Sequence, residues 1–175
     1  MRNGGRSGWR EVFRPLGLAA LLVVSVLGTT RAGQAGPAPF LDDRSTPEAL
    51  IASLYNAIDR QEYLRAWSYY AEGEGRPAWD DYPAGFAQTR TVTVKTGAVT
   101  SEGAAGSVYS NVPVAIRAET RSETTEVFTG CYVTRFVEPG NQAAPPYVPL
   151  QIVKGELSPA KESFETAAGT CADPG

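Results

Sequence analysis

Residues 45–67 read STPEALIASLYNAIDRQEYLRAW, and this stretch carries the clearest structural pattern of the chain. A serine and a threonine, either of which can cap a helix, precede a proline that suits the first helical turn. Glu48 lies three residues after Ser45, as in a capping box. The apolar residues that follow recur at helical spacing: Leu50, Ile51, Leu54, Tyr55 and Ile58. This pattern predicts a helix over 46–59, followed by a second helix or a bent continuation over 61–71.

From residue 90 onward, apolar and polar residues alternate with a period of two, which is typical of strands. The small residues of 101–106 predict a turn. Pro113 predicts an edge position or a bulge, because proline cannot donate a backbone hydrogen bond. The expected strands cover 91–99, 108–118, 124–137 and 147–157.

A helical hairpin followed by an antiparallel meander predicts an α+β fold. The hairpin is expected to pack on one face of a curved sheet of about four strands. A cone-like arrangement of this kind leaves a cavity at the open end of the helix layer. We expect Leu54, Ile58 and Trp67 to be buried between the helices and the sheet.

The first 35 residues have the pattern of a secretory signal peptide. Arginines precede an uncharged apolar run over 15–28, and small residues surround the expected cleavage site between Ala32 and Ala35. The run is shorter than the ~20 apolar residues of a membrane span, and an uncleaved anchor is the alternative. We expect an exported protein, periplasmic or secreted, without a stable membrane span after cleavage. The predicted organisation is a signal peptide and cleavage region (1–35), a flexible lead-in (36–44), an α+β cone domain (45–158) and a tail tethered by a disulfide (159–175).

Composition excludes several kinds of site. The chain has no histidine, so it cannot form a Ser-His-Asp triad, a Cys-His pair or a histidine-ligated metal centre by itself. Its two cysteines, Cys131 and Cys171, are too few for a thiolate zinc site. We therefore expect no metal and no cofactor. In an oxidising compartment the two cysteines are expected to form a disulfide, with two free thiols as the alternative.

The charge of the chain bears on its partners. The net charge is −3, and removal of a leader with five arginines and one glutamate changes it to −7. Nucleic acids and anionic lipids are bound by cationic surfaces, so an acidic domain is a poor candidate for either. The expected partners are a small-molecule ligand or an envelope protein. The sequence does not specify the oligomeric state.

Residues 47–67 resemble the opening helices of the nuclear-transport-factor-2-like (NTF2-like) superfamily, which includes ketosteroid isomerase and scytalone dehydratase. This resemblance implies a cone-shaped α+β fold. Residues 104–114, 128–135 and 142–152 resemble a group of exported proteobacterial proteins with no assigned activity. The catalytic carboxylates of the superfamily's enzymes cannot be placed on matching positions, so the resemblance implies no enzymatic activity.

Aromatic residues are the strongest candidates for a binding surface. Tyrosine and tryptophan combine apolar bulk with a polar tip, which suits a small-molecule pocket. We select Trp67, Tyr70 and Tyr132 as candidate ligand-binding residues, with plain core packing as the alternative. Asp80 and Asp81 beside Tyr82 are weaker candidates for acid–base catalysis, since acidic pairs next to proline and glycine are usually solvated turn residues.

Three functions remain open at this point. The first is an exported module that binds a small apolar or aromatic ligand, or a protein partner, without catalysis. The second is a small cofactor-independent isomerase, dehydratase or hydrolase that uses aspartate and tyrosine in the cone. The third is a structural component of an envelope complex. The lining of the cavity distinguishes them, because catalysis needs an ionisable group placed there.

Overall fold

In the computed structural model, which describes residues 36 and 38–172, the main helix begins where the sequence predicts it. The Thr46 hydroxyl caps it by accepting a hydrogen bond from the Ala49 amide at 3.1 Å. The predicted signal peptide lies outside the described residues. The elements are α1 (Pro47–Asp59), α2 (Tyr63–Trp67), η1 (Ala84–Phe86), β1 (Thr89–Thr96), β2 (Thr100–Ala104), β3 (Ser107–Thr120), β4 (Thr125–Val137), η2 (Pro139–Asn141) and β5 (Leu150–Pro159).

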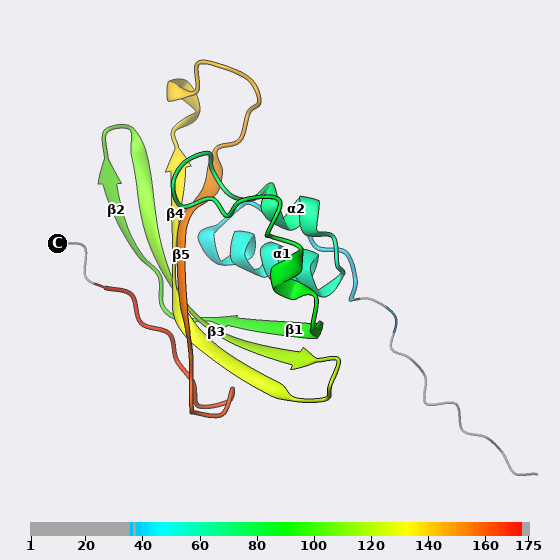
Figure 1. Ribbon diagram of the computed structural model, residues 1–175. Helices are drawn as coiled ribbons and strands as arrows, with labels where there is room; N and C mark the ends of the chain where they lie inside the picture. Colours follow the sequence, from blue (N-terminus) through cyan, green and yellow to red (C-terminus); the bar gives the residue numbers. More distant parts are fainter. Residues whose placement is uncertain (1–35, 37, 173–175) are drawn as a thin grey trace, which may run out of the picture. The chain divides into compact units, whose positions relative to one another are not determined.

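The strands form one antiparallel sheet in the order β1-β3-β4-β5, and β2 pairs with the part of β3 that β1 leaves free. Figure 1 shows the curved sheet with α1 and α2 on one face and the C-terminal segment on the other. This arrangement confirms the predicted α+β class. The sheet has five strands where about four were expected.

The additional strand is β2, which occupies most of the segment predicted as a turn. All five of its residues are exposed, so it lacks the apolar alternation by which strands are recognised. The turn itself is confined to Ala105 and Gly106, both with positive φ. Pairing with β3 therefore makes this segment a strand.

Helix α2 is shorter than the predicted 61–71 and ends at Trp67. Beyond it, the chain pairs with the edge of β5: the Ile152 amide donates to the Tyr69 carbonyl at 2.9 Å, and the Ala71 amide donates to the Ile152 carbonyl at 2.8 Å. These backbone groups satisfy their hydrogen bonds on the sheet, so they do not continue the helix.

The lead-in, predicted to be flexible, is docked on α1 from residue 38 onward. The Asp43 amide donates to the Ser53 hydroxyl at 2.7 Å, and the Leu41 amide donates to the Asn56 side-chain oxygen at 3.0 Å. The Arg65 guanidinium lies 4.6 Å from the centre of the Phe40 ring. Polar side chains of the helices thus fix a segment whose composition indicates a loop.

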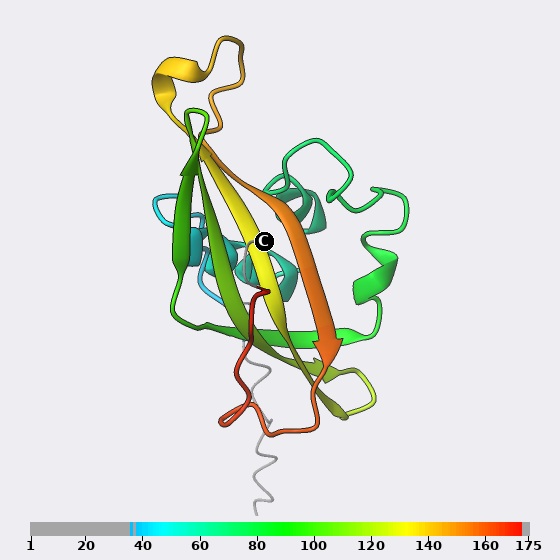
Figure 2. The same ribbon diagram turned by 90° about the vertical axis from the view of Figure 1, so that its left-hand side faces the viewer.

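The C-terminal segment crosses the sheet face opposite the helices, which is visible in Figures 1 and 2. The Ala160 amide donates to the Val127 carbonyl at 2.7 Å, and the Lys95 ammonium donates to the Glu165 carbonyl at 2.9 Å. Ala115 on β3 is buried although it lies on this outer face, with Ala167 beside it. The segment therefore covers the outer face of the sheet.

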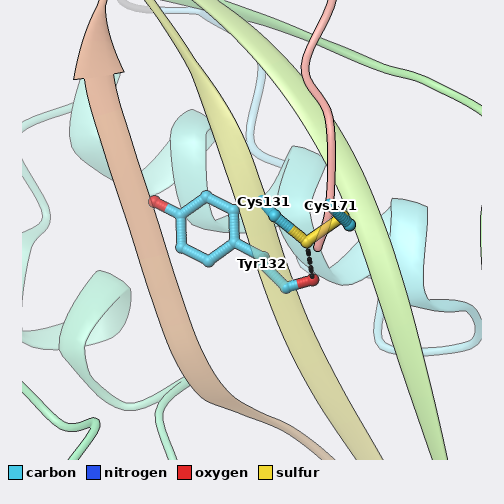
Figure 3. Close-up of a disulfide and its surroundings, with 3 residues drawn as sticks. All are labelled: Cys131, Tyr132 and Cys171. Atoms are coloured by element: carbon cyan, nitrogen blue, oxygen red, sulfur yellow. Dashed lines mark hydrogen bonds between the residues drawn. A yellow bond between two sulfur atoms is a disulfide. The ribbon is translucent and has the colours of Figure 1, made fainter. Parts of the chain in front are cut away.

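The predicted disulfide between Cys131 and Cys171 is confirmed, with a Cα–Cα distance of 5.0 Å. Figure 3 shows that the Tyr132 ring points away from this bond. Consecutive strand residues face opposite sides of a sheet, so β4 presents Cys131 to the tail and Tyr132 to the helices. Among the described residues, no helix is long and apolar enough to cross a membrane.

Candidate ligand-binding pocket

A pocket of about 270 Å³ opens between α1, η1 and the helix-facing side of the sheet. Its lining is mostly aliphatic and aromatic, with one carboxylate. The lining residues are Tyr55, Gly85, Phe86, Thr89, Val92, Ile116, Ala118, Glu126, Phe128 and Leu157.

Strand register brings these side chains to one face. Ile116 pairs with Phe128, and Ala118 pairs with Glu126, so β3 and β4 point alternate residues toward the pocket. The η1 turn lies across from them and contributes Phe86. Residues remote in sequence therefore form one apolar wall.

Four buried tyrosines, which we call the tyrosine cluster, adjoin this pocket: Tyr55, Tyr70, Tyr82 and Tyr132. The hydroxyls of Tyr55 and Tyr132 share a hydrogen bond at 2.8 Å. The rings of Tyr70 and Tyr82 meet edge to face, with centroids 6.2 Å apart. Tyr55 belongs both to the cluster and to the pocket lining, so it connects the two.

Two further observations describe the surroundings of the cluster. A Cβ atom added to Gly155 would lie 2.4 Å from the Tyr132 ring, so the glycine makes room for that ring. The Tyr82 hydroxyl is buried and has no hydrogen-bond partner in the part of the chain that the structure describes. A buried hydroxyl without a partner costs free energy, and Tyr82 is not among the residues that line the pocket.

Burial sets the ionisation of the cluster. Burial, and next the neighbouring hydroxyls of Tyr55 and Tyr70, raise the pKa of Tyr132 well above its usual value. Burial is also the main cause that raises the pKa values of Tyr55, Tyr70 and Tyr82. The four phenols are therefore neutral at neutral pH, and they can form hydrogen bonds but supply no charge.

These raised pKa values predict a loss of stability in alkali. Above about pH 10 the unfolded chain loses phenolic protons that the folded chain keeps, so the free energy of unfolding should fall as pH rises. Below that pH the phenols should contribute no pH dependence. Urea unfolding between pH 8 and 11 measures this. Tyr132→Phe should make the fall shallower, whereas the same change at the exposed Tyr147 should not. A free energy that stays constant across this range would contradict the prediction.

The structure separates the three predicted ligand-binding residues. Tyr70 and Tyr132 belong to the buried cluster. Trp67 lies at the margin of the core, where its indole N–H donates to the Pro77 carbonyl at 2.8 Å. The Arg76 guanidinium lies 3.3 Å from the centre of the Trp67 ring. Leu54 is fully buried as expected, but Trp67 is only half-buried, and its indole contacts Arg76, Pro77 and Trp79 of the segment that follows α2.

The weaker catalytic candidates are also separated. Tyr82 is buried in the cluster, whereas Asp80 and Asp81 are exposed and are not part of the pocket lining. Sequence reasoning did not single out the residues that β3, β4 and β5 contribute, such as Phe128 and Glu126. The alternation along β3 and β4 could have identified them, provided that the face toward the helices was known.

The described residues contain no group of three or more aspartate, glutamate, cysteine or histidine side chains that could hold a metal ion. The pocket lining consists mainly of carbon surface, together with one carboxylate and the hydroxyls of Tyr55 and Thr89. Such an arrangement can enclose an apolar molecule and form a few hydrogen bonds to it.

Similarity to known proteins is found among solved structures. No family model and no curated protein matches the sequence. Among solved structures, an NTF2-like superfamily protein from Salmonella enterica serovar Typhimurium is similar, with 15% identity and a TM-score of 0.47 over 69% of this chain and 93% of that one. A hexachlorocyclohexane dehydrochlorinase, LinA type 2, is 11% identical with a TM-score of 0.42 over 63% of this chain and 84% of that one. The described elements themselves, helices packed on a curved five-stranded antiparallel sheet, give this chain the α+β fold that its sequence resemblance to the NTF2-like superfamily implies.

Proposed function

We propose that this chain is an exported module whose domain binds a small apolar ligand in the pocket beside the tyrosine cluster. The observation that carries this proposal is the lining, in which aromatic and aliphatic side chains from six elements surround a volume of about 270 Å³. Removing apolar surface from water supplies the affinity, at about 25 cal/mol per Å².

Pocket size limits the ligand. A cavity of ~150 Å³ holds benzene, so this pocket suits a molecule of about two fused rings. The hydroxyls of the lining are that of Tyr55, which shares a hydrogen bond with the Tyr132 hydroxyl, and that of Thr89. A ligand with one polar atom could therefore be oriented without ionisation of the protein.

The other two functions depend on different features. Catalysis by aspartate and tyrosine would need Asp80 or Asp81 to reach the pocket, and both are exposed outside its lining. A structural role in an envelope complex needs an exposed apolar patch for the partner. Binding is the function that uses the pocket as it stands.

Titration of a two-ring neutral alcohol, 1-naphthalenemethanol, tests the proposal. The full chain is expressed in a Gram-negative host, and the periplasmic protein should have lost 32 to 35 residues. Calorimetry should then show saturable binding at one site. Ala118→Phe, which fills the pocket, should weaken binding about tenfold or more, equivalent to ~1.4 kcal/mol.

A matched control distinguishes filling of the pocket from a general effect of an added ring. Ala104→Phe places the same ring on the exposed strand β2 and should leave binding unchanged. Far-ultraviolet circular dichroism checks that both variants fold. No saturable binding by the wild-type protein, or equal binding by Ala118→Phe, would refute the proposed function. Periplasmic material that still carries Met1 would refute cleavage of the leader.

A further inference from the structure

The lining of the pocket is mostly apolar, but it also includes one acidic residue, Glu126. No lysine or arginine lines the pocket. Glu126 pairs with Ala118 in the β3–β4 register and lies two residues before Phe128, on the face toward the helices. Its side chain is exposed, so its carboxylate is in contact with water.

Two arginines in the segments next to the pocket have other partners. The Arg90 guanidinium donates to the Glu119 carboxylate at 2.9 Å, and Glu119 belongs to the opposite face of β3. Arg121 donates through Nε to the Ala87 carbonyl at 3.0 Å. Within residues 38–172, Glu126 has neither an ion pair nor a side-chain hydrogen bond. The mouth of the pocket therefore presents an uncompensated negative charge.

We propose that the ligand of this pocket is an apolar cation, in which a ring system fills the lining and an ammonium group pairs with Glu126. This inference rests on the proposed function and specifies its ligand class. Two features support a cation over an anion or a neutral molecule. The carboxylate attracts it, and Phe86 and Phe128 place aromatic side chains, which attract cations, in the same lining. The negative charge of the whole domain also favours the approach of cations.

The expected preference is modest because Glu126 is solvated. Exposed ion pairs contribute little, so we expect an ammonium ligand to bind about threefold to tenfold tighter than its neutral isostere. The preference should shrink as salt is added, because exposed charges are screened. An anionic isostere should bind more weakly than either.

The test compares 1-naphthylmethylammonium with 1-naphthalenemethanol, which share a ring system and differ in charge. In the wild-type protein at low salt, the ammonium probe should bind about threefold to tenfold tighter. Glu126→Gln should lower its affinity to that of the alcohol. Glu102→Gln on strand β2 removes the same charge far from the pocket lining and should keep the preference.

The outcomes separate the two proposals. Equal affinity of both probes for the wild-type protein would overturn the ligand class and leave the binding function standing. A preference that Glu102→Gln abolishes as fully as Glu126→Gln would assign it to net charge and would also overturn the inference. Failure of both probes to bind would refute the proposed function itself.

Discussion

Leu54→Ala is expected to lower the free energy of unfolding by about 2–5 kcal/mol. Leu54 is fully buried on α1, on the apolar stripe that faces the sheet. Truncation removes apolar atoms from the core and leaves a cavity that the surrounding side chains fill only in part. Leu50 and Ile51 are also fully buried beside it, which limits collapse around the site. Urea unfolding at neutral pH measures the loss.

The matched control is Leu64→Ala on α2. Leu64 is 65% exposed, so the same truncation there should change the free energy of unfolding by no more than about 0.5 kcal/mol. Equal losses for the two variants would show that the described packing of α1 on the sheet is wrong. The difference between them isolates burial, because the chemistry of the substitution is identical.

Replacing both cysteines, Cys131→Ala with Cys171→Ala, is expected to lower the free energy of unfolding by up to ~4 kcal/mol. The bond joins residues 40 apart in sequence, and a cross-link of this length mainly restricts the unfolded chain. The tail also depends on close backbone contact. A Cβ atom added to Gly169 would lie 2.4 Å from backbone atoms of Val114 and Gly130.

Two further measurements, on reduced wild-type protein and on ligand binding, test this prediction. Wild-type protein treated with a reductant should match the double variant, because both lack the cross-link. Binding of 1-naphthalenemethanol should be retained in both, since the tail covers the sheet face opposite the pocket (Figure 2). An unchanged free energy of unfolding in the double variant would contradict a stabilising role for the disulfide.

Local sequence patterns predicted the parts of the fold that depend on neighbouring residues. The cap and the apolar spacing predicted α1, and the period of two predicted strands β3 and β4, which contain Ile116 and Phe128. The pairing of Cys131 with Cys171 followed from their number and the expected compartment. Each of these depends on chemistry within a few residues or on composition.

The pocket and the tyrosine cluster could not be predicted in the same way. Tyr55 and Tyr132 are 77 residues apart, and their hydroxyls meet only because α1 packs on the sheet that contains β4. Trp67 is a residue type that often lines pockets, yet here its ring lies against the Arg76 guanidinium of the segment that follows α2. Long-range packing decides which aromatic side chain lines a cavity. The spacing of residues along a helix shows which of them share a face, but it does not show what that face packs against.

Three features were predicted from the sequence and confirmed: the α+β class, the start of α1 and the disulfide between β4 and the tail. Those features follow from backbone propensity, alternation and cysteine chemistry, which act locally or by count. Only the tertiary structure decided that β2 is a strand, that the lead-in is docked on α1, and that Glu126 lies at the mouth of an apolar pocket. Register and packing between distant segments determine these features, because a side chain's environment is made by residues that are remote along the chain.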